Sequence, residues 1–204
     1  GAGFLAWRLQ TPLNSLFGLP GEKRRFTGSY EAESFAGNAF PTTSWVADDP
    51  KPLDSRSYRL AVEGEVARPL SLRLEELDGD YELVATLDCT GGFYSEQRWC
   101  GVRLGQLIDR AGAAPDAQHI RVVSVTGYRW SFSLADAREM LLATRVGGEP
   151  LSHGHGAPAR LVAPGRRGFQ WVKWVTRLEL RSEPDPGAFP STILSSFSAA
   201  GRGA

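Results

Sequence analysis

Short segments that alternate between apolar and polar residues, separated by glycine- and proline-rich turns, most constrain the fold of this chain. Alternation and β-branched residues predict strands, whereas apolar residues spaced three or four apart predict helices. The expected strands are 57–62, 81–87, 120–125, 130–134, 159–163 and 171–180. The expected helices are 70–77, 104–111 and 135–143, the second with Gly112 as its C-cap. Because these elements interleave irregularly, we predict an α+β fold with mixed β-sheets and short helices.

The length and charge of the chain limit the classes of protein to consider. Its 204 residues suit one domain with a buried core. The 23 basic and 23 acidic residues balance, so we expect no nucleic-acid partner. We divide the chain into an N-terminal arm (1–34), a main domain (35–180) and a tail (181–204). The apolar residues 1–7 are too short to span a membrane and are not preceded by methionine, so we expect a membrane segment upstream in a longer protein.

Cys89 lies where a side chain is well presented to a large ligand. It follows the predicted strand 81–87 and opens the turn Cys89-Thr-Gly-Gly92. Two adjacent glycines leave the space around the sulfur sterically open. A thiolate is a soft donor suited to a redox metal.

Two downstream segments carry groups suited to an anionic ligand. They are His155-Gly-Ala-Pro-Ala-Arg160 and Gly168-Phe-Gln-Trp-Val-Lys-Trp174. Arg160 and Lys173 supply positive charge, and a guanidinium grips a phosphate with two parallel hydrogen bonds. Glycines in both segments let backbone N–H groups approach the ligand.

In this order the segments resemble the molybdopterin-binding domain of the sulfite oxidase superfamily over about residues 35–180. The turn at Cys89 is similar to the loop whose cysteine binds molybdenum, and the two later segments match the family's HGxPxR and VKW motifs. Three weaker similarities are Asn38-Ala-Phe-Pro41, Trp99-Cys-Gly-Val-Arg-Leu104 and the stretch around Tyr128. The resemblance implies the sulfite oxidase molybdopterin-binding fold.

The resemblance also implies an activity: molybdopterin-dependent, two-electron oxygen-atom transfer on a small, sulfur-containing substrate. Cys89 is then the molybdenum ligand, and Tyr128 is a hydrogen-bond donor near the substrate oxygen. The implied cofactor-binding residues are Asn38, Ser124, His155, Arg160, Trp171, Val172 and Lys173.

The chain departs from the sulfite oxidases where those enzymes surround sulfite with arginines. The corresponding positions here read Gly37, Phe93 or Tyr94, and Gln170. A dianion would lose charge-assisted hydrogen bonds worth roughly 1.5–3 kcal/mol each. We therefore expect a less charged substrate such as a sulfoxide, as in the related bacterial methionine-sulfoxide-reductase branch. Some positive field can still come from Arg98, Arg166 and Arg167.

The same comparison suggests a separate electron partner. The chain has three histidines and no segment resembling a haem domain, and few residues follow Leu180 where relatives carry an immunoglobulin-like domain. We expect a membrane haem or quinone module as the partner. The expected location is periplasmic or extracytoplasmic, with a membrane tether in the full-length protein as a further hypothesis.

Three other interpretations stay open. The first is a non-catalytic, β-rich binding module stapled by a Cys89–Cys100 disulfide. The second is a zinc site formed by these cysteines with His153 and His155, although the long gap before His153 does not match compact zinc spacings. The third is a degenerate family member that keeps the fold without the cofactor.

Overall fold

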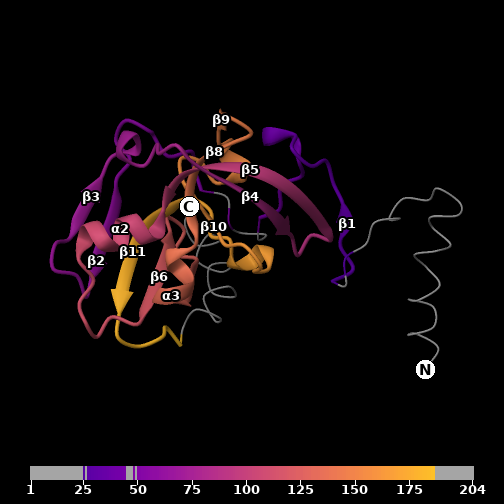
Figure 1. Cartoon of the computed structure of the whole chain (residues 1–204). Helices are drawn as coiled ribbons and strands as arrows, with labels where there is room; N and C mark the ends of the chain where they lie inside the picture. The colour runs from indigo at the N-terminus through magenta and orange to yellow at the C-terminus, as the bar shows by residue number, and fades with distance from the viewer. Residues whose placement is uncertain (1–24, 26, 45–47, 49, 187–204) are drawn as a thin grey trace, which may run out of the picture.

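The computed structural model describes residues 25, 27–44, 48 and 50–186, whose strands form two mixed sheets (Figure 1). The six-stranded sheet contains β1 (Tyr30–Glu31), β4 (Tyr81–Asp88), β5 (Phe93–Arg103), β8 (Leu141–Val146), β9 (Glu149–Pro150) and β10 (Arg160–Val162). The five-stranded sheet contains β2 (Leu60–Gly64), β3 (Leu70–Leu72), β6 (His119–Ser124), β7 (Arg129–Ser133) and β11 (Val175–Arg181). The helices are α2 (Leu104–Ala111), α3 (Leu134–Arg138) and the 3₁₀ turns η1 (Gly37–Ala39), η2 (Leu74–Glu76), η3 (His153–His155) and η4 (Gly168–Gln170).

Both sheets combine parallel and antiparallel pairs. In the first sheet the order is β1-β5-β8-β10, with β4 paired to β5 and β9 to β8, and only β1–β5 is parallel. In the second the order is β3-β2-β11-β6-β7, and only β2–β11 is parallel. The predicted class, mixed sheets with short helices, is confirmed, and β-structure predominates.

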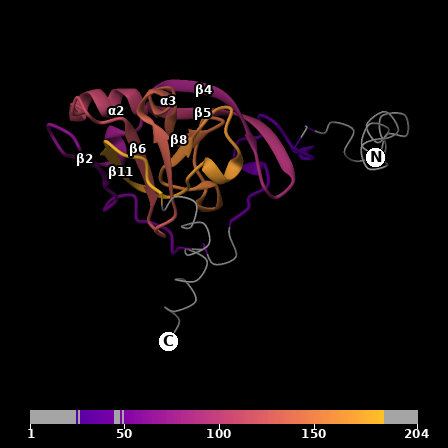
Figure 2. The ribbon, with the colours of Figure 1, turned by 90° about the horizontal axis from the view of Figure 1, so that it is seen from below.

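The core is formed by the inner faces of the two sheets and by the helices. The apolar face of α2 is buried through Leu104, Leu107 and Ile108, and its neighbour α3 lies beside it in Figure 2. Gly112 ends α2 in a left-handed conformation with φ of 67°, as predicted for the C-cap. Among the described residues, no helix combines the length and the apolar character that crossing a bilayer requires.

Two predicted helices are wrong, each because strand pairing overrides a helical pattern, and two strand predictions also differ from the structure. Residues 70–77 form β3 and a 3₁₀ turn, since Leu70–Leu72 pairs with β2. In 135–143 the helix stops at Arg138 and Leu141 begins β8, a central strand held by β5 and β10. The long strand β5 was not predicted, and the last predicted strand begins at Val175, not at Trp171.

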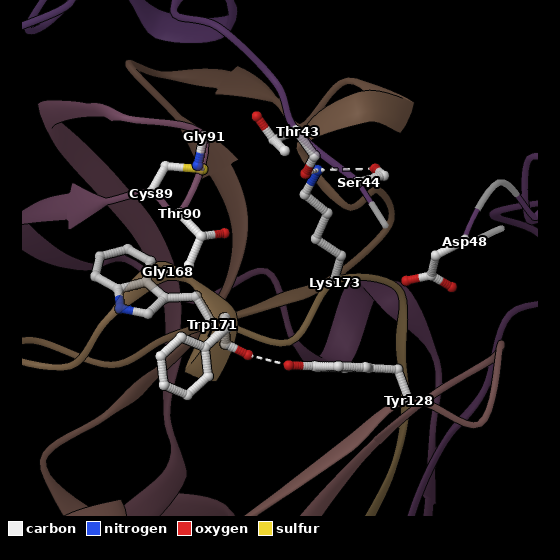
Figure 3. Close-up of a pocket in the computed structure, with 11 residues that line it drawn as sticks. Thr43, Ser44, Asp48, Cys89, Thr90, Gly91, Tyr128, Gly168, Trp171 and Lys173 are labelled. Carbon is white, nitrogen blue, oxygen red and sulfur yellow. Dashed lines mark hydrogen bonds between the residues drawn. The ribbon is translucent and has the colours of Figure 1, made fainter. Parts of the chain in front are cut away.

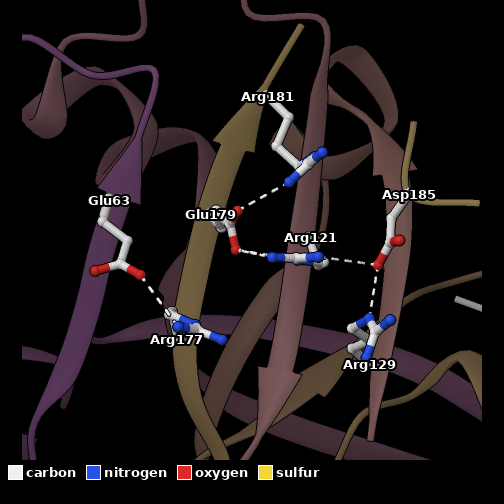
Figure 4. A network of polar contacts seen from close by, with 7 residues as sticks. All are labelled: Glu63, Arg121, Arg129, Arg177, Glu179, Arg181 and Asp185. Carbon is white, nitrogen blue, oxygen red and sulfur yellow. Dashed lines mark hydrogen bonds and ion pairs between the residues drawn. The ribbon is translucent and has the colours of Figure 1, made fainter. Parts of the chain in front are cut away.

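Ion pairs cover the outer face of the five-stranded sheet (Figure 4). Arg121 on β6 bonds Glu179 on β11 and lies 3.3 Å from Asp185, which also contacts Arg129 on β7 at 2.7 Å. Asp185 thus ties the chain just after β11 back onto this sheet. The predicted tail otherwise falls mostly outside the described residues.

We predict that Gly101→Ala lowers the free energy of unfolding by about 3 kcal/mol, because overpacking a closed core displaces backbone. An added Cβ would collide with the Leu142 carbonyl oxygen and lie 2.8 Å from the Ala143 Cα, both on β8. Gly148→Ala is the control: its φ is +86° but the space around it is open, so only about 1–2 kcal/mol of strain is expected. Urea denaturation measures both. Equal losses in the two variants would contradict the close approach of β5 and β8.

Candidate active site

Two adjoining cavities lie where the end of β4, the turns η3 and η4 and the loop before β2 meet. The larger one, which we call the outer cavity, has a volume of about 300 Å³ (Figure 3). It is lined by Thr43, Ser44, Asp48, Cys89, Thr90, Gly91, Tyr128, Gly168, Phe169, Trp171 and Lys173. The inner cavity, of about 40 Å³, is lined by Phe40, Pro41, Thr42, Thr43, Leu87, Cys89, Phe93, His155, Arg160, Gly168, Trp171 and Lys173. The two cavities therefore share the Cys89 thiol.

The turn after β4 holds Cys89 between the cavities. The Cys89 N–H donates to the Phe93 carbonyl at 2.8 Å, and the Gly91 N–H points to the sulfur at 3.4 Å. A Cβ on Gly168 would lie 2.9 Å from the Cys89 Cα, so only glycine lets η4 come this close. The thiol consequently has backbone on two sides, and Cys89 lines both cavities although it is largely buried.

Asp88, the residue before Cys89, is held in place by side chains from the N-terminal part of the chain. Thr27 and Ser29 donate to the Asp88 carboxylate at 2.8 and 2.7 Å, and Arg25 and Arg167 lie 3.3 Å from it. Asp88 is buried. Its satisfied carboxylate fixes where β4 ends and where the Cys89 turn begins.

Arg160 is a cation buried without an acidic partner. It is 1% exposed, and its guanidinium lies between the rings of Trp99 and Trp171, 5.0 and 5.7 Å from their centroids. One amino group donates to the His155 carbonyl at 3.0 Å, but Nε has no partner. Burial lowers the pKa of Arg160 to about 10, opposed by the charge of Cys89. No carboxylate of the described residues pairs with it, so the guanidinium fits an anionic ligand in the inner cavity.

Lys173 is the second cation, and it lines both cavities. Its ammonium donates to the carbonyls of Thr43 and Gly154 and lies 3.4 Å from the Ser44 hydroxyl (Figure 3). Burial and the charge of Arg160 lower the pKa of Lys173 to about 8, while Cys89 and Asp48 oppose this shift. Two cations held close together at a cavity favour an anion there.

His155 is held neutral by its surroundings. Its Nε2 lies 3.0 Å from the Phe40 carbonyl and therefore carries the proton, so Nδ1 accepts from the Ser152 hydroxyl at 2.7 Å. Burial and the charge of Arg160 lower its pKa to about 4. Because both ring nitrogens have partners within the chain, His155 lines the inner cavity as a fixed wall and joins Arg160 to η1.

Tyr128 lines the outer cavity, but its hydroxyl proton already takes part in a hydrogen bond within the chain. The hydroxyl donates to the Phe169 carbonyl on η4, drawn as a dashed line in Figure 3. Burial, and secondarily the charge of Asp48, raise the pKa of Tyr128. The phenol oxygen therefore offers an acceptor to the cavity, whereas the sequence led us to expect a donor.

Of the other implied cofactor residues, only Trp171 lines the cavities. Asn38 bonds the Pro150 carbonyl and the Ser152 N–H and thereby fixes the loop before η3. Ser124 lines a separate surface hollow beside Gly127. Val172 is fully buried, and its carbonyl accepts from the Leu161 N–H. The side chains of Asn38 and Ser124 do not reach either cavity, and Val172, which we expected to contribute through its backbone, is not among the lining residues.

The cavity walls also include residues that sequence reasoning did not select. Asp48 is the most notable, because it is a buried carboxyl with one unpartnered oxygen, Oδ1. It lies in the run Asp48-Asp-Pro-Lys-Pro52, which has the composition of a solvent-exposed turn. Thr43 and Thr90 also line the outer cavity from irregular segments, so no periodicity could have revealed them.

The three arginines expected to restore a positive field are each paired with a carboxylate. Arg98 lies 3.0 Å from Glu82, and Arg166 lies 2.7 Å from Asp136. Arg167 is bound to Asp88. None of the three lines either cavity. Among the positions where sulfite oxidases carry arginine, only Phe93 borders one, the inner cavity.

Two alternative interpretations lose their structural basis. Cys89 and Cys100 are both free thiols, so no disulfide staples the fold. Over the described ranges, no three histidine, cysteine or acidic side chains come together as metal ligands, so the proposed zinc set is not assembled.

The chain belongs to the oxidoreductase molybdopterin-binding domain family, whose sequence profile matches residues 47–189. Two mixed sheets with short helices and a presented cysteine agree with this assignment. The resemblance to the sulfite oxidase superfamily is thereby confirmed.

Individual relatives include several molybdenum-family oxidoreductases. Human mitochondrial sulfite oxidase is 33% identical over 165 residues, which cover 64% of this chain and 30% of that protein. The uncharacterized oxidoreductase YuiH of Bacillus subtilis is 30% identical over 147 residues, covering 70% of this chain and 74% of that protein. Among solved structures, the sulfane dehydrogenase SoxCD of Paracoccus pantotrophus matches with a TM-score of 0.63 and 28% identity, over 66% of this chain and 40% of that one. The chain thus spans about a third of the sulfite oxidases it matches.

We predict that His155 makes stability depend on pH between about 6.5 and 4. Its pKa in the folded chain is about 4, below the ordinary 6.5, so the unfolded chain takes up the proton first as the pH falls. Stability is therefore full above pH 6.5 and falls by up to about 3 kcal/mol as the pH approaches 4. Denaturant titrations of wild type and His155→Gln over this range measure the effect.

The matched control is His119→Gln, at the start of β6 outside both cavities. It should keep the wild-type slope, whereas His155→Gln should flatten it. Identical pH profiles for wild type and His155→Gln would contradict the buried neutral imidazole.

Proposed function

We propose that this chain is a molybdopterin-dependent oxidoreductase domain that catalyses two-electron oxygen-atom transfer on a small, sulfur-containing substrate. The observation that carries the proposal is Arg160, a buried guanidinium with an unpartnered Nε and no acidic partner among the described residues, which lines the inner cavity together with the Cys89 thiol. Burying an unpaired charge costs several kcal/mol unless a ligand compensates it. Membership of the molybdopterin-binding family names a ligand of the required charge.

The residues of the two cavities fit such a cofactor. Arg160 and Lys173 would hold its anionic groups, and Trp171 would form a wall against its ring. Cys89 would bind molybdenum through sulfur, a soft ligand for a metal already bound by sulfur. When bound, the cofactor supplies the oxygen-atom and electron chemistry, while the protein supplies position and electrostatics.

The volumes of the two cavities indicate what each could hold. The inner cavity, of about 40 Å³, has room only for a small group, so the bulk of the cofactor would lie in the outer cavity of about 300 Å³, which also adjoins Cys89. Tyr128 and Phe169 close part of the wall of the outer cavity. A small substrate would then have to bind beside the cofactor near Cys89.

We also propose a separate electron partner, a membrane haem or quinone module, and a periplasmic or extracytoplasmic location. These proposals rest on the sequence resemblance described above. Co-purification of a haem protein with the natively expressed full-length protein, or its absence, tests the partner directly.

We predict that Cys89→Ala abolishes turnover and lowers the molybdenum content at least tenfold. Among the described residues, Cys89 carries the only sulfur that borders both cavities, and the substitution removes it. Metal analysis and pterin fluorescence of natively expressed full-length protein provide the measurement. The control is Cys100→Ala, whose thiol is buried near Glu82 on β4 and lines neither cavity. Retained molybdenum and activity in Cys89→Ala would overturn the assignment.

We predict that Arg160→Met separates cofactor binding from stability. Methionine keeps much of the apolar packing between Trp99 and Trp171 and removes the unpaired charge, so the stability of the cofactor-free protein should change by no more than about 1 kcal/mol. Pterin retention should fall at least tenfold. The measurements are urea denaturation of the cofactor-free protein and pterin content after native expression. A cofactor-free protein destabilised by several kcal/mol would show instead that Arg160 serves the fold alone.

A further inference from the structure

The turn that carries Cys89 has little conformational preference of its own. Gly91 and Gly92 make up half of the turn Cys89-Thr-Gly-Gly92, and Gly92 adopts the left-handed region with φ of 87°. Glycine loses more conformational freedom on folding than any other residue. A turn of this composition therefore needs contacts from outside itself to hold the sulfur in one place.

Such contacts come from the N-terminal part of the described chain, at both ends of the turn. Before the cysteine, the Thr27 and Ser29 hydroxyls donate to different oxygens of the Asp88 carboxylate, at 2.8 and 2.7 Å. At the other end, the Tyr30 N–H donates to the Gly92 carbonyl at 2.9 Å, where β1 begins its pairing with β5. We call Thr27, Ser29 and Tyr30 the clasp.

A further contact lies at the middle of the turn. A Cβ on Gly91 would lie 2.6 Å from the Thr43 Oγ1 and 3.6 Å from the Cys89 sulfur, so Thr43 packs directly against the turn (Figure 3). The Gly91 N–H points to the same sulfur at 3.4 Å. A displacement of the turn would therefore move the sulfur and also the N–H group that faces it.

The clasp acts mainly through sheltered polar contacts. Asp88 is 6% exposed and Ser29 is 1% exposed, whereas the Tyr30 side chain is 44% exposed and adds little apolar burial. Hydrogen bonds to a buried carboxylate are among the stronger ones in proteins. Arg25 and Arg167 lie 3.3 Å from its two oxygens and compensate its charge locally. Asp88 thus acts on the turn through geometry more than through its electric field.

We infer that Asp88 is a positioning residue: together with the clasp, it fixes the Cys89 sulfur where a metal ligand is needed. This inference deepens the proposed function and rests on it only for the identity of the metal. A metal ligand has to be held within about 0.5 Å of its bonding position. Loss of the groups that orient a ligand typically lowers metal affinity by about 10–100-fold.

The first test measures the thiols of the full-length protein expressed without its cofactor. Iodoacetamide labels a buried cysteine at a rate that depends on how often the thiol becomes exposed. The double variant Thr27→Val/Ser29→Ala removes both hydroxyl donors of the clasp. We expect it to be labelled at Cys89 at least tenfold faster than the wild type, since the loss of one hydrogen bond to a charged group corresponds to about that factor.

Cys100 is the internal control for the labelling, because it is buried on β5 and lines neither cavity. Its rate should not change in the double variant. An unchanged rate at Cys89, or an equal rise at both cysteines, would overturn the inference, and the equal rise would show that the clasp serves only the fold as a whole. If the double variant does not fold, Ser29→Ala alone decides by the same two rates.

The matched control variant is Thr86→Val. It removes one hydrogen bond from a hydroxyl to a carboxylate, that of Thr86 to Glu96 at 3.3 Å, on the same strand β4 but away from the turn. Both cysteines should be labelled at their wild-type rates. Faster labelling of Cys89 in this variant would show that any loss of a hydrogen bond on β4 exposes the thiol, and would contradict a specific role of Asp88.

The second test measures the molybdenum content of natively expressed full-length protein. The double variant should contain at least tenfold less molybdenum than the wild type. Thr27→Ser, which keeps both hydroxyl donors, and Thr86→Val should contain the wild-type amount. A fully loaded double variant contradicts the positioning role alone. A wild type that takes up no molybdenum contradicts the proposed function, and the labelling rates then decide the role of Asp88.

Discussion

The buried guanidinium of Arg160 is the interaction on which the rest of the site depends. Between Trp99 and Trp171 it has aromatic faces and one carbonyl but no carboxylate of the described chain. Aromatic stacking offsets part of the cost of burying this charge, and an anion would have to supply the remainder. Burial, together with the charge of Arg160, also lowers the pKa of the nearby Lys173. The cofactor-free chain is thus already organised electrostatically around a negative ligand.

The fold brings three segments that are distant in the sequence to this charge. β4 ends in the Cys89 turn, η3 and β10 supply His155 and Arg160, and η4 is followed by Trp171 and Lys173. Close approach is possible because glycine occupies the contact points. A Cβ on Gly156 would lie 3.0 Å from the Lys173 side chain and 3.1 Å from that of Arg160. The absence of a side chain at Gly156 thus allows the Arg160 and Lys173 side chains to pack closely on either side of it.

Sequence reasoning identified the residues carried by contiguous motifs and missed those placed by tertiary packing. The structure places Cys89, Arg160, Lys173 and Trp171, which belong to such motifs, at the cavities. Asn38 and Ser124 point elsewhere, since the direction of a side chain in a loop or at a strand end depends on its neighbours. Asp48 was missed because a turn-like composition gives no sign that folding buries it. The same limit applies to β8, whose apolar run fits a helix until β5 and β10 pair with it.

The anchoring of Asp88 bears on where the functional unit begins. The family profile starts at residue 47, yet Thr27 and Ser29 bind the Asp88 carboxylate next to Cys89, the proposed metal ligand, and Phe40 and Thr43 line the inner cavity. A recombinant fragment cut at the profile boundary would keep the Cys89 turn and the HGxPxR and VKW motifs, but it would lose the hydrogen bonds that hold Asp88 beside the sulfur. Such a fragment would be isolated without metal, and it could be mistaken for a family member that does not bind the cofactor, although only the segment before residue 47 was missing.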